Sequence, residues 1–174
     1  MNNLEVVLKQ EEISKKIKEL GQELAQKYKN DNPVVIGIMK GAIYFLTELT
    51  QNMPIELEVD LMGLSSYGNS ATTSGKVRIT KDISVDITNR HVIIVEDIVD
   101  TGTTLEYLKK YFVNQEAKSV ETVSLFIKTK SINNKTLPDK ILFEVPNDFL
   151  VGYGLDYQNK YRHLKNVCKI EVSE

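Results

Sequence analysis

Two short, almost uninterrupted apolar runs limit the folds that are open to this chain. Residues 34–39 read VVIGIM and residues 91–95 read HVIIV, so each has the length of one strand and is rich in β-branched side chains. Runs of this kind are typical of strands that are buried on both faces of a parallel sheet. Further strands are predicted at residues 55–61, 77–79, 120–127 and 141–145.

Helical patterns stand between the expected strands. Apolar residues recur at intervals of three or four from Ile13 to Tyr28, which predicts an amphipathic helix that ends before Pro33. Shorter patterns of the same period begin at Ile43 and Leu105. Because strands alternate with helices, the sequence predicts an α/β fold with a mainly parallel central sheet flanked by helices. Residues 149–172 are irregular, and we expect them to pack over the carboxyl ends of the strands.

The size and charge of the chain narrow its class. A single domain over residues 1–174 is expected, and the formal charge of −2 comes without a basic stripe, which argues against nucleic acid as the main partner. The longest apolar stretch, residues 34–49, is interrupted by Lys40 and is too short to cross a bilayer, and the polar N-terminus does not resemble a signal peptide. The lone Cys168 suits a reducing compartment and is interpreted as a buried structural thiol. We therefore expect a cytoplasmic protein without a membrane partner.

The segment VIIVEDIVDTGTTL, residues 92–105, carries the strongest functional signal. Its apolar strand runs into Glu96 and Asp97, Asp100 follows, and the small hydroxyl-rich loop 101–104 leads into a helix. Ligands of open α/β sheets bind beyond the carboxyl ends of the strands, and a helix N-terminus offers unpaired N–H groups to an anion. The loop is therefore interpreted as a phosphate site, with the acids facing ribose hydroxyls or Mg²⁺. A capped helix after a strand would explain the threonines but not the acids.

This segment resembles the phosphoribosyl-pyrophosphate signature of the type I phosphoribosyltransferases. Nearly the whole chain resembles the hypoxanthine-guanine phosphoribosyltransferase family. The further matches, in that family's order, are Met39-Lys40-Gly41 for the pyrophosphate loop, Ser66-Tyr67-Gly68 for the mobile lid, Lys128 for a base-binding lysine, and VGYGLDY followed by Tyr161-Arg162. The resemblance implies the type I phosphoribosyltransferase fold with a small hood formed mainly by about residues 140–174, with the N-terminal residues as a further candidate part.

The resemblance also implies a reaction. A Mg²⁺-dependent enzyme of purine salvage would transfer 5-phosphoribosyl from phosphoribosyl pyrophosphate to N9 of hypoxanthine or guanine, giving IMP or GMP and pyrophosphate. Such an enzyme is a glycosyltransferase acting on pentosyl groups, and the family implies a homodimer or homotetramer. Two alternatives stay open: a xanthine-preferring phosphoribosyltransferase and a non-catalytic sensor of phosphoribosyl pyrophosphate. Asp100, Lys128 and Arg162 argue against a sensor, which needs neither a general base nor a base-binding lysine.

The resemblance assigns a role to each candidate residue. Asp100 would be the general base that accepts the purine N7 proton. The binding roles are Glu96 and Asp97 for the ribose hydroxyls and Mg²⁺, Thr101, Gly102, Thr103 and Thr104 for the 5-phosphate, Lys40, Gly41 and Arg162 for pyrophosphate, Ser66 and Tyr67 for the lid, and Lys128, Lys140, Ile141 and Asn147 for the purine. The peptide bond on the Lys40 side of the pyrophosphate loop is often cis in this family. Taken singly, the three cations Lys40, Lys128 and Arg162 could also be surface residues.

Two positions depart from the family pattern. Asn147 stands where an acid is usual, and Lys140 stands where an aromatic residue usually stacks on the purine. Asn147 would be a weak Mg²⁺ ligand because an amide oxygen lacks the charge of a carboxylate. Lys140 could cover the purine with its methylene stem, and we expect some use of xanthine that depends on this lysine.

Overall fold

The computed structural model describes residues 4–66, 77–130 and 136–171, and its centre is a six-stranded sheet in the order β4-β3-β2-β5-β6-β7. The strands are β2 (Val34–Met39), β3 (Glu58–Ser66), β4 (Val77–Lys81), β5 (His91–Val99), β6 (Ser119–Lys128) and β7 (Lys140–Val145). Strand β4 pairs antiparallel with β3, whereas β3, β2, β5, β6 and β7 pair in parallel. The predicted α/β fold with a mainly parallel sheet is confirmed.

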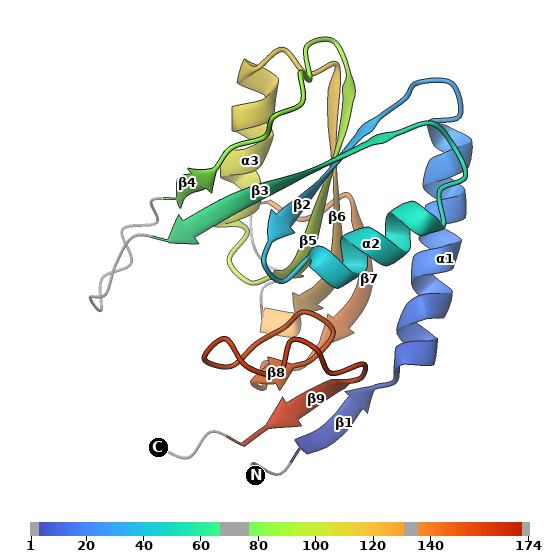
Figure 1. Cartoon of the computed structure of the whole chain (residues 1–174). Helices are drawn as coiled ribbons and strands as arrows, with labels where there is room; N and C mark the ends of the chain where they lie inside the picture. The colour runs from blue at the N-terminus through green and yellow to red at the C-terminus, as the bar shows by residue number, and fades with distance from the viewer. Residues whose placement is uncertain (1–3, 67–76, 131–135, 172–174) are drawn as a thin grey trace.

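Helices cover both faces of this sheet (Figure 1). They are α1 (Gln10–Lys27) and α2 (Ile43–Gln51) on one face and α3 (Thr103–Asn114) on the other. Along β2, Val35 packs in the cluster that contains the apolar side chains of α1 and α2, whereas Val34 and Ile36 pack with Leu108 and Phe112 of α3. Because successive side chains of a strand point to opposite faces, burial on both sides requires the continuous apolar run.

The predicted start of β3 is wrong. The sequence predicted a strand over residues 55–61, but β3 begins at Glu58, which pairs with Val34 at the start of β2. Pairing with β4 carries β3 on to Ser66, the first residue of the expected mobile lid Ser66-Tyr67-Gly68. Residues 67–76 lie outside the described residues.

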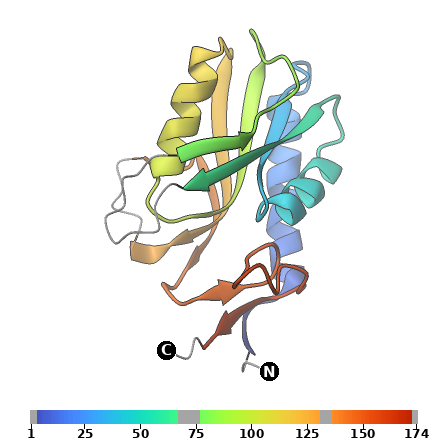
Figure 2. The same cartoon turned by 60° about the vertical axis from the view of Figure 1, so that its left-hand side comes forward.

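A second, smaller sheet forms the hood, which lies beyond the carboxyl ends of the central strands (Figures 1 and 2). Its order is β1-β9-β8, with β1 (Leu4–Leu8), β9 (Val167–Ile170) and β8 (Leu150–Val151), all antiparallel. Val151, Cys168 and Ile170 form its own small core, whereas Leu150 and Val167 pack in the main cluster with α1 and α2. The hood is therefore fixed to the body of the protein by apolar contacts.

Two expectations about the hood need revision. It was expected from about residue 140, but residues 140–145 form β7 at the edge of the large sheet, so the hood begins after Val145. Within the segment 149–172, the described residues 149–171 do not extend the large sheet, as expected, but they contain β8 and β9 rather than being wholly irregular. Cys168 is a buried free thiol whose pKa is raised by burial. The helices of the described residues are each too short or too polar to span a lipid bilayer.

Candidate active site

Three neighbouring cavities lie where the carboxyl ends of β2, β5 and β6 meet the hood. Their volumes are about 300, 190 and 140 Å³. Asp97 lines the first and second, and Glu96 and Thr104 line the first and third. The acids at the end of β5 therefore join three spaces that can each hold one part of an extended ligand.

The largest cavity collects charged groups from three parts of the chain. Lys40 and Gly41 follow β2, Glu96 and Asp97 belong to β5, and Asp156 and Arg162 come from the hood. A nitrogen of Arg162 lies 2.6 Å from the Asp156 carboxylate, and its other terminal nitrogen donates to the Gly154 carbonyl at 2.7 Å. The structure thus brings together Lys40, Gly41 and Arg162, which the sequence predicted for one anionic group.

Two glycines allow the chain segments around this cavity to approach closely. A Cβ atom at Gly41 would lie 1.6 Å from a carboxylate oxygen of Asp97. Gly154 has a φ of +99°, and a Cβ there would lie 2.0 Å from the carbonyl oxygen of Gly41. Any larger residue would push these segments apart. The Met39–Lys40 peptide bond is cis, as the resemblance implied.

Glu96 and Asp97 form a buried acidic pair. Glu96 is 6% exposed, and burial together with the neighbouring Asp97 charge raises its pKa well above the usual range. Burial raises the pKa of Asp97 to about 6, although the Ile98 N–H, which donates to its carboxylate at 2.8 Å, and Arg162 both act to lower it. Ionising both acids in this site is costly, so the pair favours a ligand that supplies positive charge or hydroxyl donors.

The smallest cavity lies at the start of α3 and is lined by Asp100, Thr101, Gly102 and Thr104, among others. Gly102 occupies the position before the helix with a φ of +73°, and no side chain caps it. Thr101 donates its hydroxyl to Thr103 at 3.1 Å. A helix that begins on a glycine beside a cavity offers the N–H groups of its first turn to an anion.

The middle cavity combines a cation with apolar walls. Lys128, at the carboxyl end of β6, lines it together with Phe149, Leu150 and Leu155 of the hood. The Phe149 ring is 49% exposed and meets Tyr157 edge to face, with 5.3 Å between the ring centroids. An exposed ring beside a lysine suits a flat, polar-edged ligand such as a nucleobase.

Sequence reasoning missed Phe149 and Asp156. The available signal was their position, because Phe149 directly precedes VGYGLDY and Asp156 is the acid within it. Only the fold places this segment opposite β5 and β6.

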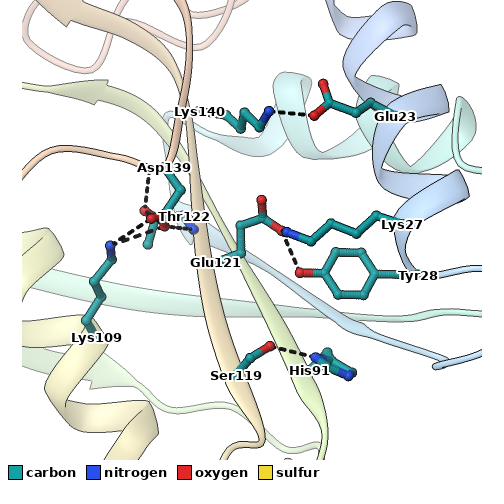
Figure 3. A network of polar contacts seen from close by, with 10 residues as sticks. All are labelled: Glu23, Lys27, Tyr28, His91, Lys109, Ser119, Glu121, Thr122, Asp139 and Lys140. Atoms are coloured by element: carbon teal, nitrogen blue, oxygen red, sulfur yellow. Dashed lines mark hydrogen bonds and ion pairs between the residues drawn. The ribbon is translucent and has the colours of Figure 1, made fainter.

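The structure contradicts the predicted purine-binding positions of Lys140 and Ile141. Lys140 pairs with Val123 and Val145 with Lys128, so Lys140 is the first residue of β7 and lies roughly 16 Å along the strand from its carboxyl end. Its ammonium group lies 2.5 Å from the Glu23 carboxylate on α1 (Figure 3). Ile141 follows Lys140 in β7, paired with Ser124.

The structure separates Asn147 from the acidic pair and describes only part of the predicted lid. Asn147 lies beyond the end of β7, where its side-chain amide donates to Thr129 at 3.4 Å rather than joining Glu96 and Asp97. Ser66 is the last residue of β3, and Tyr67 falls outside the described residues.

Known proteins share this arrangement. A family model described as a phosphoribosyl transferase domain matches residues 3–158. Proteins named hypoxanthine-guanine phosphoribosyltransferase include that of Bacillus subtilis strain 168, which is 45% identical over 159 residues (91% of this chain, 88% of the relative), and that of Streptococcus mutans, 42% identical over 166 residues (95% and 92%). A solved hypoxanthine phosphoribosyltransferase from Staphylococcus aureus superposes with a TM-score of 0.90 at 35% identity, covering 96% of this chain and 91% of that one. The chain therefore belongs to the type I phosphoribosyltransferase family, among the hypoxanthine-guanine phosphoribosyltransferases.

Proposed function

We propose that the protein is a purine-salvage enzyme that transfers 5-phosphoribosyl from phosphoribosyl pyrophosphate to N9 of hypoxanthine or guanine, releasing pyrophosphate and forming IMP or GMP. The observation that carries this proposal is the joining of three cavities by Glu96 and Asp97. A cavity with two cations suits pyrophosphate, one at a helix start suits the 5-phosphate, and one with a lysine and an aromatic ring suits the base. The ribose then lies over the two acids that join them.

Pyrophosphate binds between the two sides of the largest cavity. Lys40 and the backbone at Gly41 hold it from the β2 side, and Arg162 holds it from the hood. The transition state is oxocarbenium-like, with positive charge on the ribose and negative charge on the leaving pyrophosphate. Glu96 and Asp97 accept hydrogen bonds from the ribose hydroxyls, and their charge stabilises the cationic sugar.

Mg²⁺ fits the donor set of this cavity. Glu96, Asp97 and Asp156 line it without forming a three-carboxylate metal cluster among the described residues. Mg²⁺ is usually held by only one or two carboxylates together with substrate phosphates and water. Bound there, the ion would neutralise the charge of the leaving pyrophosphate. Asn147, proposed earlier as a weak ligand, has no part in this set.

The base binds in the middle cavity. Lys128 donates to the 6-oxo oxygen of the purine, and the ring of Phe149 covers one purine face. Asp100, at the edge of the neighbouring cavity, accepts the proton from N7 as N9 attacks the ribose. Lys140 is the first residue of β7, whereas the base cavity lies at the carboxyl ends of the strands. Lys140 therefore cannot favour xanthine, and the prediction of xanthine use is withdrawn.

One assay tests the proposal. The protein is incubated with Mg²⁺, phosphoribosyl pyrophosphate and hypoxanthine, guanine, xanthine or uracil in turn, and nucleotide formation is followed by chromatography, with an excess of chelator as the control. We expect IMP and GMP and no product with uracil. Phosphoribosyl-pyrophosphate binding without product from any base would instead support a sensor. Assembly into a homodimer or homotetramer and a cytoplasmic location stay predictions.

A further inference from the structure

The short hood segment 152–155 lies directly against the pyrophosphate loop. Gly152, Tyr153 and Gly154 have φ values of +95°, +49° and +99°, so three successive residues adopt left-handed conformations. Glycine accepts this conformation freely, whereas a tyrosine is strained in it because its Cβ approaches the following carbonyl oxygen. The side chain of Tyr153 must therefore make contacts that offset this cost.

The Tyr153 side chain reaches from the hood to α2. It is 5% exposed, and its hydroxyl donates to the carboxylate of Glu48 on α2. Its ring lies 6.2 Å from that of Tyr44 on the same helix, centroid to centroid. Burial, and after it the bond to Glu48, raise the pKa of the Tyr153 hydroxyl, so the group stays protonated and remains a donor throughout the working pH range.

Both ends of this bond are continuous with the walls of the largest cavity. Helix α2 begins immediately after the loop that carries Lys40 and Gly41. On the hood side, the N–H of Tyr153 donates to the Leu164 carbonyl at 2.8 Å, and the N–H of Gly154 donates to the Arg162 carbonyl at 3.0 Å. A shift of Tyr153 relative to Glu48 would therefore move Arg162 relative to Lys40.

We propose that Tyr153, bound to Glu48, is a positioning residue that sets the spacing between the two cationic sides of the pyrophosphate site. This inference rests on the proposed function. Tyr153 lines neither the pyrophosphate cavity nor the base cavity, so its role acts through Gly154 and Arg162 on one side and through α2 on the other. Its effect should be selective for phosphoribosyl pyrophosphate and pyrophosphate, and the base should bind as before.

Tyr153→Phe tests this selectively, because it keeps the ring and removes the hydroxyl. We expect the KM for phosphoribosyl pyrophosphate to rise about tenfold, the size of effect typical for losing one hydrogen bond to a charged group. The KM for hypoxanthine should stay within about twofold, since the base cavity is unchanged. Tyr44→Phe, which removes the hydroxyl of the neighbouring exposed tyrosine, is the matched control and should behave like the wild type.

Changes at Glu48 test the same bond from α2. Glu48→Gln keeps an acceptor oxygen and should retain most of the wild-type KM, whereas Glu48→Leu should match Tyr153→Phe. The double variant Tyr153→Phe with Glu48→Leu should be no worse than either single variant, because both remove one interaction. Calorimetric titration with magnesium pyrophosphate gives a readout that does not depend on turnover.

The outcomes separate the two proposals. A lowered melting temperature with an unchanged KM and unchanged pyrophosphate affinity would overturn the positioning role and leave Tyr153 a stabilising contact. Equal rises of both substrates' KM values, or additive effects in the double variant, would also overturn it. Failure of the wild type to make nucleotide from any base would refute the proposed function instead.

Discussion

Two buried glutamates on neighbouring strands of the same sheet differ in whether the protein supplies polar partners for their carboxylates. Glu121, near the amino end of β6, is 7% exposed and accepts hydrogen bonds from the Tyr28 hydroxyl at 2.5 Å and from Lys27 at 2.8 Å (Figure 3). Glu96, at the carboxyl end of β5, is 6% exposed and stands beside a second acid. Within the described residues, no hydrogen bond or ion pair to the Glu96 carboxylate is found. The two side chains are therefore equally buried, but the protein itself satisfies the Glu121 carboxylate, whereas the Glu96 carboxylate is left to interact with a ligand.

The amino end shows what a structural polar cluster looks like. A cavity of about 470 Å³ lies there, larger than any of the three at the carboxyl end. Its polar groups bind one another: His91 shares a hydrogen bond with Ser119 at 2.6 Å, and Asp139 accepts from the hydroxyl and N–H of Thr122 (Figure 3). Cavity size therefore does not identify the ligand site. The pairing of the buried acids distinguishes the two ends better.

The largest expected effect comes from Asp100 at the carboxyl end. Asp100→Asn keeps the shape of the side chain but removes the proposed general base, and loss of a general base typically lowers turnover by about 10²–10⁴. Affinity for phosphoribosyl pyrophosphate and the melting temperature should change little. Steady-state kinetics and a binding titration check this, with Glu121→Gln as the control at the amino end. Near-normal turnover in Asp100→Asn would remove the assigned role.

The converse change is Glu121→Ala. It leaves the buried Tyr28 hydroxyl without its acceptor, and we expect the free energy of unfolding to fall by about 1–3 kcal/mol. The kcat/KM of the folded enzyme should stay within about twofold because the amino end contacts no substrate. Urea denaturation followed by kinetics at low temperature measures both. Lost turnover with unchanged stability would contradict the structural role assigned to Glu121 at the amino end.

The base site offers a paired test of Phe149 against Lys140. Stacking of a base on an aromatic ring contributes about 1–3 kcal/mol, so Phe149→Ala should raise the KM for hypoxanthine by roughly 5- to 150-fold. Lys140→Ala should leave the ratios of kcat/KM for hypoxanthine, guanine and xanthine unchanged, because its ammonium is bound to Glu23. A change of base preference in Lys140→Ala would contradict the placement of this lysine.

The smallest expected signal is a pH effect of Asp97. Burial raises the pKa of this carboxyl from 3.8 to about 6 in the free protein. Between these pH values the unfolded chain loses the proton while the folded protein keeps it, so the free energy of unfolding falls as the pH rises from about 4 to about 6. Magnesium phosphoribosyl pyrophosphate favours the ionised form, and binding near pH 6 should therefore release a fraction of a proton. Calorimetry in two buffers with different heats of ionisation measures this release.

The Asp97→Asn variant is the control for this proton release. Asp97→Asn cannot ionise, so it should abolish the proton release and stabilise the free protein at pH 7 while weakening substrate binding. A less stable Asp97→Asn protein at pH 7 would show that the carboxylate contributes to folding, as Glu121 does.

The sequence predicted the elements whose determinants are local. The bounds of β2 were correct because both of its faces are buried and its composition changes abruptly at Pro33 and Lys40. Loop 101–104 and the acids before it could be predicted to lie together because residues 92–105 place a strand end and a helix start side by side in the chain. The lid predicted at Ser66 and Tyr67 stays a prediction, since Tyr67 lies outside the described residues.

The errors arose where distant segments meet. Phe149 and Asp156 reach the site only through the packing of the hood, which no local pattern encodes. The error at Lys140 was avoidable, because a parallel strand that starts at residue 140 must have its first residue at the amino edge, away from the ligand side. The direction of the predicted strand therefore excludes its first residues from a ligand site at the carboxyl edge of the sheet.

The pairing of β1 with β9 has a consequence for the order in which the protein folds. Leu4 lies opposite Ile170, so this pairing joins two segments that are far apart in the sequence. Contacts of large sequence separation cost loop-closure entropy before they stabilise the fold, so they tend to form late. The parallel sheet, with the acids of β5 at its carboxyl edge, can therefore assemble before the hood docks. During refolding, substrate binding should return after the sheet has formed, once the hood brings Asp156 and Arg162 to these acids.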